Sequence, residues 1–346
     1  MIYLYRTLFQ KISLKLCYNI FVRILARLIL LLLILAPPAL AMGTPPSTQP
    51  VKQLYPQVEY AGMFGYAGSG DGQFYYPKAV DVPAFGDLTT DVGNVFVADT
   101  GNNRIQRLNP DGSPVYQFGF FGSGGKEFNA PSGIAIDFNH FIFVSDKENH
   151  RIQKFDIYGN FISAWGSFGT EKGQFRSPRG IALDYWGNVY AADVENDRIQ
   201  KFDLNGNYMQ SFGAFGVGGG FFDNPSDVAV DRDRNIFIAD TNNHRIQVID
   251  EYGQPRLSFG GFGGKAGQFD FPQGIAINDD IICVADTGNN RIQVFDKRGN
   301  FLLLFGEKGS NPGQFMEPVG LAFGAGKILY VVDSRNQRIQ KFQLRY

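Results

Sequence analysis

The chain has 346 residues with 32 basic and 33 acidic side chains, so its formal net charge is −1. This balance lacks the strong positive field that sequence-independent binding to nucleic-acid phosphates requires. The two cysteines, Cys17 and Cys283, are also too few to build a zinc-binding RING module.

The first 41 residues have the composition of a secretory signal peptide. Five basic and no acidic residues precede an uncharged apolar stretch, residues 28–36, which is followed by two prolines and by Ala39-Leu40-Ala41. An uncleaved membrane anchor is the alternative, but residues 28–42 number only 15, fewer than the roughly 20 that cross a bilayer as a helix. We expect residues 1–41 to form a helical signal peptide that is cleaved after Ala41, or else a membrane anchor that is retained. In either case we expect the protein to be exported to the periplasm, the cell surface or the medium.

Residues 42–56 contain Pro45, Pro46 and Pro50 among Ser, Thr and Gln, and they are predicted to form a flexible linker. Loss of residues 1–41 would remove five of the basic side chains and leave 27 against 33 acidic ones, a formal charge of −6. The acidic balance further disfavours a nucleic-acid partner. Cys17 would leave with the same segment, so we expect no intrachain disulfide in the mature protein.

One phrase, Asp followed five residues later by Arg-Ile-Gln, recurs six times between residues 99 and 340. Successive copies are separated by 47, 47, 47, 46 and 47 residues. A period of this size indicates a repeat fold in which each copy is one supersecondary unit that buries its apolar faces against its neighbours. The six copies begin at Asp99, Asp146, Asp193, Asp240, Asp286 and Asp333.

Each repeat predicts four β-strands. The third repeat, residues 175–213, opens with Phe-x-x-Pro-x-Gly and continues with four short runs that are rich in β-branched and aromatic residues. Gly, Asn and Asp turns separate the runs, and no sustained 3.6-residue apolar period indicates a helix. Four antiparallel strands in each of six repeats predict an all-β fold, a six-bladed β-propeller around a central channel.

The fifth repeat contains three informative motifs: Pro272-Gln-Gly-Ile-Ala, Val284-Ala-Asp-Thr-Gly-Asn-Asn-Arg-Ile-Gln-Val-Phe and Gly299-Asn-Phe-Leu-Leu-Leu-Phe-Gly. This sequence resembles the NHL repeat of six-bladed propellers, and the resemblance covers about residues 57–346. It implies the fold, whereas one fold hosts many unrelated functions. Some propellers of this family bind RNA on a basic face and others accompany RING modules in ubiquitin ligases. Charge, cysteine count and expected export disfavour both roles here.

The two ends of the repeat region are complementary. The last repeat stops after its third strand at Tyr346, and the first is preceded by an isolated strand-like segment, residues 58–65. We expect this segment to pair with residues 338–344 as the outer strand of the sixth blade, which leaves no open edge. The first repeat also contains an insertion around residues 83–91, between its first and second strands.

The six Asp/Arg pairs do not predict catalysis, because one active site is enough for an enzyme whereas every blade needs a supported hairpin. The Asp ends the second strand and can accept hydrogen bonds from turn N–H groups, and the Arg returns to pair with the carboxylate. The glycine-rich loops between blades lack Gly-Lys-Ser/Thr and do not predict a nucleotide site. Cys283 occupies a position that is aromatic in the other blades, which predicts a core residue rather than a nucleophile.

The repeats vary on one predicted face, where the loops between second and third strands and the loops that enter each blade open. The residue after each entry proline begins the innermost strand at the channel mouth, and the residue before each repeated Arg lies in a neighbouring loop. Both sets are candidate ligand-binding residues, because a concave polar mouth is the usual ligand site of such a fold. The alternative is that they are solvated loop positions that vary freely. The first set is Lys78, Ser132, Arg179, Ser226, Gln273 and Val319, and the second is Asn103, His150, Asp197, His244, Asn290 and Gln337.

Lys78 and Arg179 are the only cations in the first set, and they predict an anionic group in the ligand, such as a carboxylate or an acidic sugar. His150, Asp197 and His244 could in principle offer metal ligands. Some secreted propellers that resemble this chain are metal-dependent lyases with several histidines around the channel. The chain has only three histidines, and the full set of such a lyase is absent, so we assign no metal and no cofactor.

The sequence thus predicts an exported, monomeric recognition scaffold that binds a protein, a glycan or a small ligand on the loop face around the channel. The alternative is a propeller-type lyase or lactonase that uses the same mouth. An enzyme should show a tight cluster of acidic or histidine side chains at the channel, whereas a binder should show a broad polar and aromatic surface. A membrane contact is expected only through residues 1–41.

Overall fold

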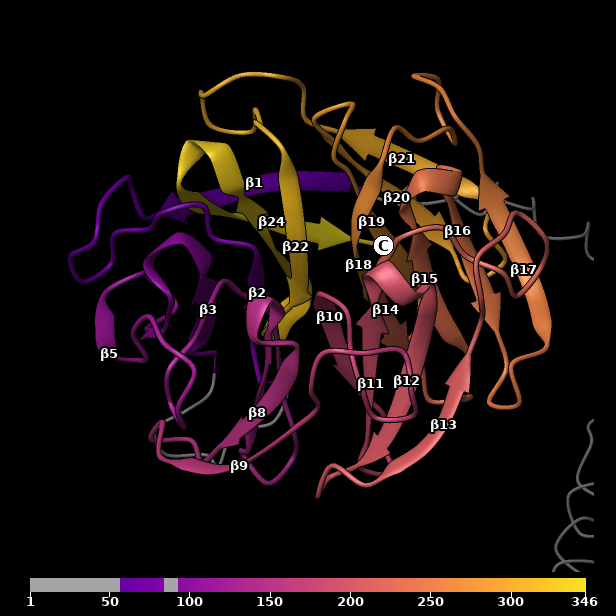
Figure 1. Cartoon of the computed structure of the whole chain (residues 1–346). Helices are drawn as coiled ribbons and strands as arrows, with labels where there is room; N and C mark the ends of the chain where they lie inside the picture. The colour runs from indigo at the N-terminus through magenta and orange to yellow at the C-terminus, as the bar shows by residue number, and fades with distance from the viewer. Residues whose placement is uncertain (1–56, 84–92) are drawn as a thin grey trace, which may run out of the picture. The chain divides into compact units, whose positions relative to one another are not determined.

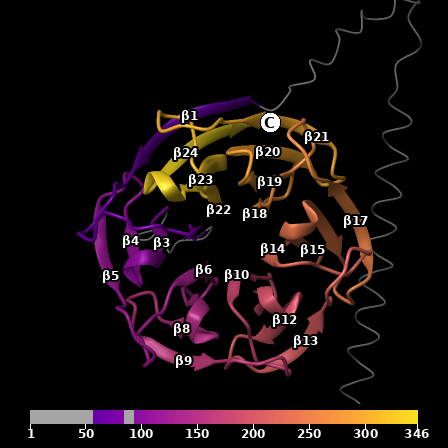
Figure 2. The ribbon, with the colours of Figure 1, turned by 45° about the horizontal axis from the view of Figure 1, so that its top comes forward.

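Six four-stranded antiparallel sheets surround a central channel (Figures 1 and 2). The computed structural model describes residues 57–83 and 93–346, so the predicted signal segment, the linker and most of the insertion lie outside the described residues. In five blades the strands run in chain order from the channel to the rim, and in the sixth the first strand of the chain, β1, lies outermost, which confirms the predicted all-β propeller. Over the described ranges, no helix is long and apolar enough to cross a membrane.

The strand boundaries repeat closely from blade to blade. Blades 1 to 3 consist of β2 (Ala79–Asp81), β3 (Val95–Asp99), β4 (Arg104–Leu108) and β5 (Pro114–Phe118); β6 (Pro131–Ile136), β7 (Ile142–Asp146), β8 (Arg151–Phe155) and β9 (Phe161–Trp165); and β10 (Pro178–Leu183), β11 (Asn188–Asp193), β12 (Arg198–Asp203) and β13 (Tyr208–Phe212). Blades 4 to 6 consist of β14 (Pro225–Val230), β15 (Ile236–Asp240), β16 (Arg245–Ile249) and β17 (Pro255–Gly260); β18 (Pro272–Ile277), β19 (Ile281–Asp286), β20 (Arg291–Asp296) and β21 (Phe301–Phe305); and β22 (Pro318–Phe323), β23 (Ile328–Asp333), β24 (Arg338–Arg345) and β1 (Gln57–Phe64).

Short 3-10 turns connect several of these strands. They are η1 (Thr100–Asn102), η2 (Lys147–Asn149), η3 (Val194–Asn196), η4 (Thr241–Asn243), η5 (Ala325–Lys327) and η6 (Ser334–Asn336). All except η5 join the second strand of a blade to its third, on the face where the sequence predicts the candidate site.

The apolar core lies between neighbouring blades. Every residue of the second strands β3, β7, β15 and β19 is buried, because the next blade covers each face of a blade. One apolar cluster, for example, joins Val80 and Val97 of blade 1 to Tyr330 and Val332 of blade 6. Cys283 of β19 lies in such a cluster and is fully buried, which confirms the prediction of a core residue, and burial raises the pKa of its thiol.

The outer strand of most blades ends in a Phe-Gly pair, such as Phe212-Gly213 in blade 3, and the glycine is required for steric reasons. The entry phenylalanine Phe222 is 0% exposed and packs against Gly213, whose φ is +91°. A Cβ atom at Gly213 would lie 2.3 Å from the Phe222 ring, so neither the backbone conformation nor the space permits a larger residue.

The Asp/Arg phrase supports the hairpins, as predicted. In blade 3, Arg198 Nε donates to Asp193 Oδ2 at 2.7 Å, and the other guanidinium nitrogens donate to three carbonyl oxygens of the loop 170–174. Asp193 Oδ1 accepts the backbone N–H of Arg176 at 2.7 Å. The same ion pair occurs in all six blades at 2.7 to 2.8 Å, so it fixes each entry loop against its own hairpin.

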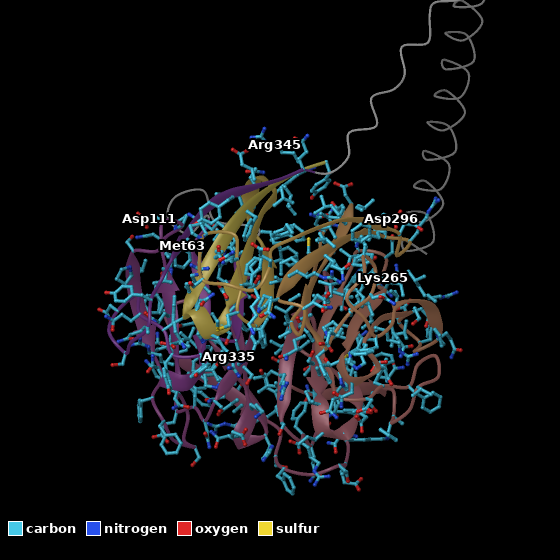
Figure 3. All side chains as sticks on the ribbon, turned by 90° about the horizontal axis from the view of Figure 1, so that it is seen from above. Met63, Asp111, Lys265, Asp296, Arg335 and Arg345 are labelled. Carbon is cyan, nitrogen blue, oxygen red and sulfur yellow. The ribbon has the colours of Figure 1, made fainter. Side chains whose placement is uncertain are left out.

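Strand β1 closes the ring, which confirms the predicted role of residues 58–65. It runs antiparallel to β24, with Gln57 opposite Arg345 and Phe64 opposite Ile339, and one bulge interrupts the register. The Arg338 guanidinium lies 3.3 Å from the sulfur of Met63, whose position on this strand is marked in Figure 3. The outer edge of β24 is therefore covered by a strand from the other end of the domain.

Candidate functional site

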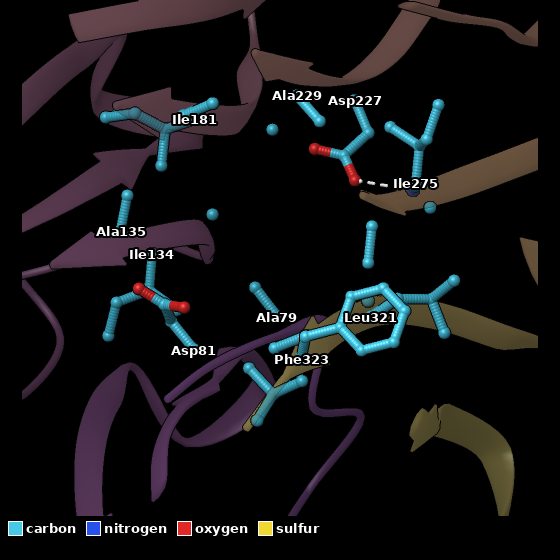
Figure 4. A pocket seen from close by; sticks show the side chains of 18 of the residues that line it. Ala79, Asp81, Ile134, Ala135, Ile181, Asp227, Ala229, Ile275, Leu321 and Phe323 are labelled. Atoms are coloured by element: carbon cyan, nitrogen blue, oxygen red, sulfur yellow. Dashed lines mark hydrogen bonds between the residues drawn. The ribbon is translucent and has the colours of Figure 1, made fainter. Parts of the chain in front are cut away.

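The central channel forms a cavity of about 900 Å³ lined by the innermost strands of all six blades. This volume is in the range of small-molecule sites, which are commonly about 300–1,000 Å³. Apolar side chains of the innermost strands, including Ile181, Leu321 and Phe323, form much of its wall (Figure 4). Polar side chains line it as well, on the innermost strands and in the loops at their ends, and the charged ones on the innermost strands bear most directly on what the channel can bind.

The structure places all six residues of the first candidate set on this wall. Ser226 and Val319 are buried there, and Ser226 Oγ already has partners, since it bonds with Thr241 Oγ1 at 2.6 Å and donates to the Gln273 carbonyl oxygen at 2.8 Å. Ser132 Oγ donates to the Ala130 carbonyl oxygen at 2.9 Å. The complete set that lines the cavity is Lys78, Ser132, Arg179, Ser226, Gln273 and Val319.

Lys78 and Arg179 differ from the rest of this set because they carry unpaired charges. Both are partly exposed, and neither side chain forms an ion pair or a hydrogen bond within residues 57–83 and 93–346. Burial lowers the pKa of Lys78; Glu317 opposes that shift and Arg179 reinforces it. Burial also lowers the pKa of Arg179, against the influence of Glu195 and Glu148. The two cations are thus partly dehydrated and line the same cavity, and the positive charge of Arg179 acts on Lys78.

The second candidate set has a structural role that the sequence analysis did not predict. Its six residues adopt left-handed backbone conformations with φ between 53° and 57°. Each side chain accepts a hydrogen bond of 2.5 to 3.1 Å from the backbone N–H of the residue before the next blade's entry proline. None of them lines the channel cavity. These interblade acceptors are Asn103, His150, Asp197, His244, Asn290 and Gln337.

His150 and His244 each use one ring nitrogen, Nδ1, in these interblade hydrogen bonds. Their Nδ1 atoms accept the N–H groups of Ser177 and Phe271, each at 3.1 Å. In the described part of the chain, no group of three or more His, Cys, Asp or Glu side chains could hold a metal ion. The structure therefore does not bring His150, Asp197 and His244 together as a ligand set.

Two carboxylates in the channel break the repeat and were missed by the sequence analysis. Asp81 occupies the fourth position after the entry proline, where the other five blades have alanine. Asp227 occupies the second position, where four blades have glycine and blade 1 has Ala79. Alignment of the innermost strands beyond their first residue would have identified both.

Both carboxylates are held in the same way. Asp81 accepts the backbone N–H of Val82 and that of Ile136 in the next blade, each at 2.8 Å. Asp227 accepts the N–H of Val228 at 2.9 Å and that of Ile275, again in the next blade, at 3.0 Å. Figure 4 shows the two carboxylates on different walls of the cavity, in agreement with their positions in blades 1 and 4.

A glycine in the preceding blade makes room for Asp227. A Cβ atom at Gly180 would lie 2.1 Å from Asp227 Oδ1 and 2.5 Å from Asp227 Cα. At the equivalent Gly274, a Cβ atom would lie 1.8 Å from the Val319 carbonyl oxygen, so this position normally tolerates no side chain. The aspartate at position 227 is consequently an exception that the local packing has to accommodate.

Protein atoms surround both carboxylates although each reaches the cavity. Burial raises the pKa of Asp81 to about 6 and that of Asp227 to about 7, and the backbone hydrogen bonds only partly oppose this shift. No basic side chain of the described ranges contributes to either shift or forms an ion pair with either group. The cavity therefore combines two unpaired cations near its mouth with two unpaired carboxyl groups on its wall.

The opposite opening of the channel is aromatic on one side and charged on the other. Phe138 and Tyr185 line it, with ring centroids 5.3 Å apart, and both side chains are exposed. Across the opening, Arg232 and Asp279 form a solvent-exposed ion pair at 3.5 Å. This opening is on the face opposite the one where the sequence predicts the candidate site.

The comparisons with known proteins agree with this architecture. The NHL repeat model matches residues 128–155, 222–249, 269–295 and 315–342, which begin at the entry phenylalanines of blades 2, 4, 5 and 6. No curated protein matches the chain significantly.

Three solved structures illustrate the similarity in fold. A protein of unknown function from Bacteroides thetaiotaomicron is 15% identical with a TM-score of 0.61, covering 84% of this chain and 76% of its own. Catalytically inactive virginiamycin B lyase from Staphylococcus aureus with quinupristin is 14% identical with a TM-score of 0.56, covering 83% and 99%. An auxiliary nutrient binding protein from Bacteroides ovatus is 12% identical with a TM-score of 0.60, covering 84% and 77%. At these identities the likeness concerns the fold alone.

Proposed function

We propose that this chain, an NHL-repeat six-bladed propeller protein, is an exported recognition scaffold that binds an anionic ligand at the channel mouth. Lys78 and Arg179 are the residues that would hold the anion. The observation that carries the proposal is that both cations face the cavity partly dehydrated and without a partner among the described residues. Desolvation of an unpaired charge costs free energy, and a bound carboxylate would offset that cost.

The alternative of a propeller lyase or lactonase has less support. Of the residues that line the cavity in the described ranges, none is a histidine, and Asp81 and Asp227 lie in blades 1 and 4 rather than side by side. The virginiamycin B lyase is similar in fold at 14% identity, which carries no argument for a shared reaction. We therefore base the proposed function on recognition and assign no catalytic residue.

Replacement of both cations tests the proposal. We expect Lys78→Ala combined with Arg179→Ala to weaken binding of hexanoate and of glucuronate by at least about tenfold, because charge-assisted contacts contribute about 1.5–3 kcal/mol. Titration calorimetry at low and high salt should also show a smaller salt dependence in the variant. Both positions are partly exposed, so the free energy of unfolding should change by no more than ~1 kcal/mol.

Two controls accompany this test. Lys265→Ala with Arg298→Ala removes the same charge from exposed positions outside the channel and should leave binding unchanged. Hexanol and glucose, which lack the carboxylate, should bind the wild-type protein more weakly than their acidic counterparts. If neither acid binds, or if the channel variant and the control variant bind both acids equally well, the proposed site is wrong.

Export is proposed from the sequence of residues 1–41. We expect the native protein, recovered from its own cells, to begin near Met42 and to occur outside the cytoplasm. Mass spectrometry of the intact protein measures its first residue. Recovery of a chain that retains Met1 in the membrane fraction would contradict cleavage and indicate an anchor.

A further inference from the structure

The channel contains two zones of opposite charge. Lys78 and Arg179 follow the entry prolines of blades 1 and 3, whereas Asp227 lies one position further along its strand and Asp81 three positions further than Lys78. At about 3.3 Å per residue, the Cα atom of Asp81 lies about 10 Å deeper than that of Lys78 along the strand, whereas that of Asp227 lies only about 3 Å beyond the first position of its own strand. A ligand that enters at the cationic mouth therefore meets carboxyl groups as it goes deeper.

Resting on the proposed function, we infer that the ligand is a short zwitterion. Its anionic group binds Lys78 and Arg179, and its protonated amine lies deeper in the channel against one of the two carboxylates, Asp81 or Asp227, which are on different walls. Amine-bearing acids with several bonds between the two charges, such as ω-amino acids or short peptides, have this chemistry. The inference names the ligand class of the same site and assigns two further binding residues to it.

The two carboxylates have free capacity to accept such an amine. Each accepts two backbone N–H groups, one on each oxygen, although a carboxylate offers about four lone-pair sites. Neither has a cation beside it among the described residues. A buried carboxylate without a counter-charge is costly, and such exceptions to a repeat pattern are typical of functional positions. The amine would supply the missing counter-charge.

Ligands of a single charge fit this cavity less well. A simple carboxylate would be attracted at the mouth but repelled by the ionised aspartates below it. A simple amine would have to pass the two cations before it reached Asp81 or Asp227. A molecule that carries an anionic group at the mouth and an amine deeper in the channel complements Lys78 and Arg179 as well as the two carboxylates.

Matched probes test the inference. At about pH 8, where both aspartates are expected to be ionised, we expect 6-aminohexanoate to bind the wild-type protein about tenfold tighter than hexanoate. Hexylamine should bind more weakly than 6-aminohexanoate, because it lacks the group that the mouth holds. Calorimetry or ligand-detected NMR measures the three dissociation constants.

Variants that restore the repeat separate this inference from the proposed function. Asp81→Ala and Asp227→Gly introduce the residues that other blades carry at these positions, so the double variant is expected to fold. It should lose the preference for 6-aminohexanoate and bind hexanoate at least as well as the wild-type protein. Asp71→Ala, which removes an exposed carboxylate of a loop outside the cavity, should retain the preference.

The two possible failures are distinguishable. If hexanoate binds through Lys78 and Arg179 as tightly as 6-aminohexanoate, or if the double variant keeps the preference, the zwitterion inference is wrong and the proposed function stands. If neither acid binds the wild-type protein, or if loss of Lys78 and Arg179 has no effect on either, the proposed function itself fails and the inference falls with it.

Discussion

At the scale of single residues, departures from the repeat mark the candidate site. Asp81 stands where the other blades have alanine, and Asp227 where most have glycine. The six Asp/Arg pairs, in contrast, are identical in every blade, and their ion pairs stabilise the hairpins. At the first position of the innermost strand, Lys78 and Arg179 are the charged exceptions among the six blades. The second and fourth positions carry Asp227 and Asp81 as exceptions of the same kind. The missed carboxylates were therefore accessible to sequence reasoning.

The raised pKa values of Asp81 and Asp227 predict a pH-dependent cost. A carboxyl group whose pKa is higher in the folded than in the unfolded state binds its proton more tightly when folded, so its contribution to stability is present below the unfolded value and is lost as pH rises through the folded one. The relevant window runs from 3.8 to about 6 for Asp81 and to about 7 for Asp227. Relative to the Asp81→Ala, Asp227→Gly variant, the wild-type protein should lose a few kcal/mol between about pH 4 and pH 8.

Urea denaturation of both proteins across this range measures the difference in unfolding free energy. The comparison cancels the titration of all other groups that the two proteins share. Asp71→Ala, which removes an exposed carboxylate outside the channel, is the control for the loss of a charged side chain. A variant that differs from wild type by the same amount at both ends of the range would show that the two carboxyl groups are not perturbed by folding.

At the scale of structural elements, the turn between the second and third strands explains why the second candidate set does not line the cavity. Its last residue has a positive φ, and its side chain accepts an N–H group from the next blade. Asn, His, Asp and Gln can all do this, so the position varies in charge and size while it keeps an acceptor within short reach. Variation alone suggested a ligand site. The shared presence of a side-chain acceptor was the signal for a structural role, and the backbone conformation that creates it is not visible in a sequence.

At the scale of the whole molecule, the fold could be predicted because every level of the sequence repeats with it. Strand runs, turn residues, Phe-Gly pairs and the Asp/Arg phrase recur together about every 47 residues, so each local choice agrees with the same architecture. The channel chemistry could be predicted only in part, because it depends on which side chains of the innermost strands reach the cavity. A few single-residue exceptions decide that, and periodicity says nothing about them.

Ring closure by β1 gives a prediction for the molecule as a whole. Deletion of residues 57–66 removes the strand that pairs with β24 and takes away Phe64, which is 8% exposed in the core between blades 6 and 1. Loss of one such side chain alone costs about 3–5 kcal/mol, so we expect the thermal midpoint to fall by about 10 °C or more. The exposed edge of β24 should also promote association between molecules. Calorimetry and light scattering measure both effects, with deletion of residues 43–52 of the predicted linker as the control. An unchanged midpoint in a monomeric protein would mean that the ring does not depend on β1, and that blade 6 is stable as three strands.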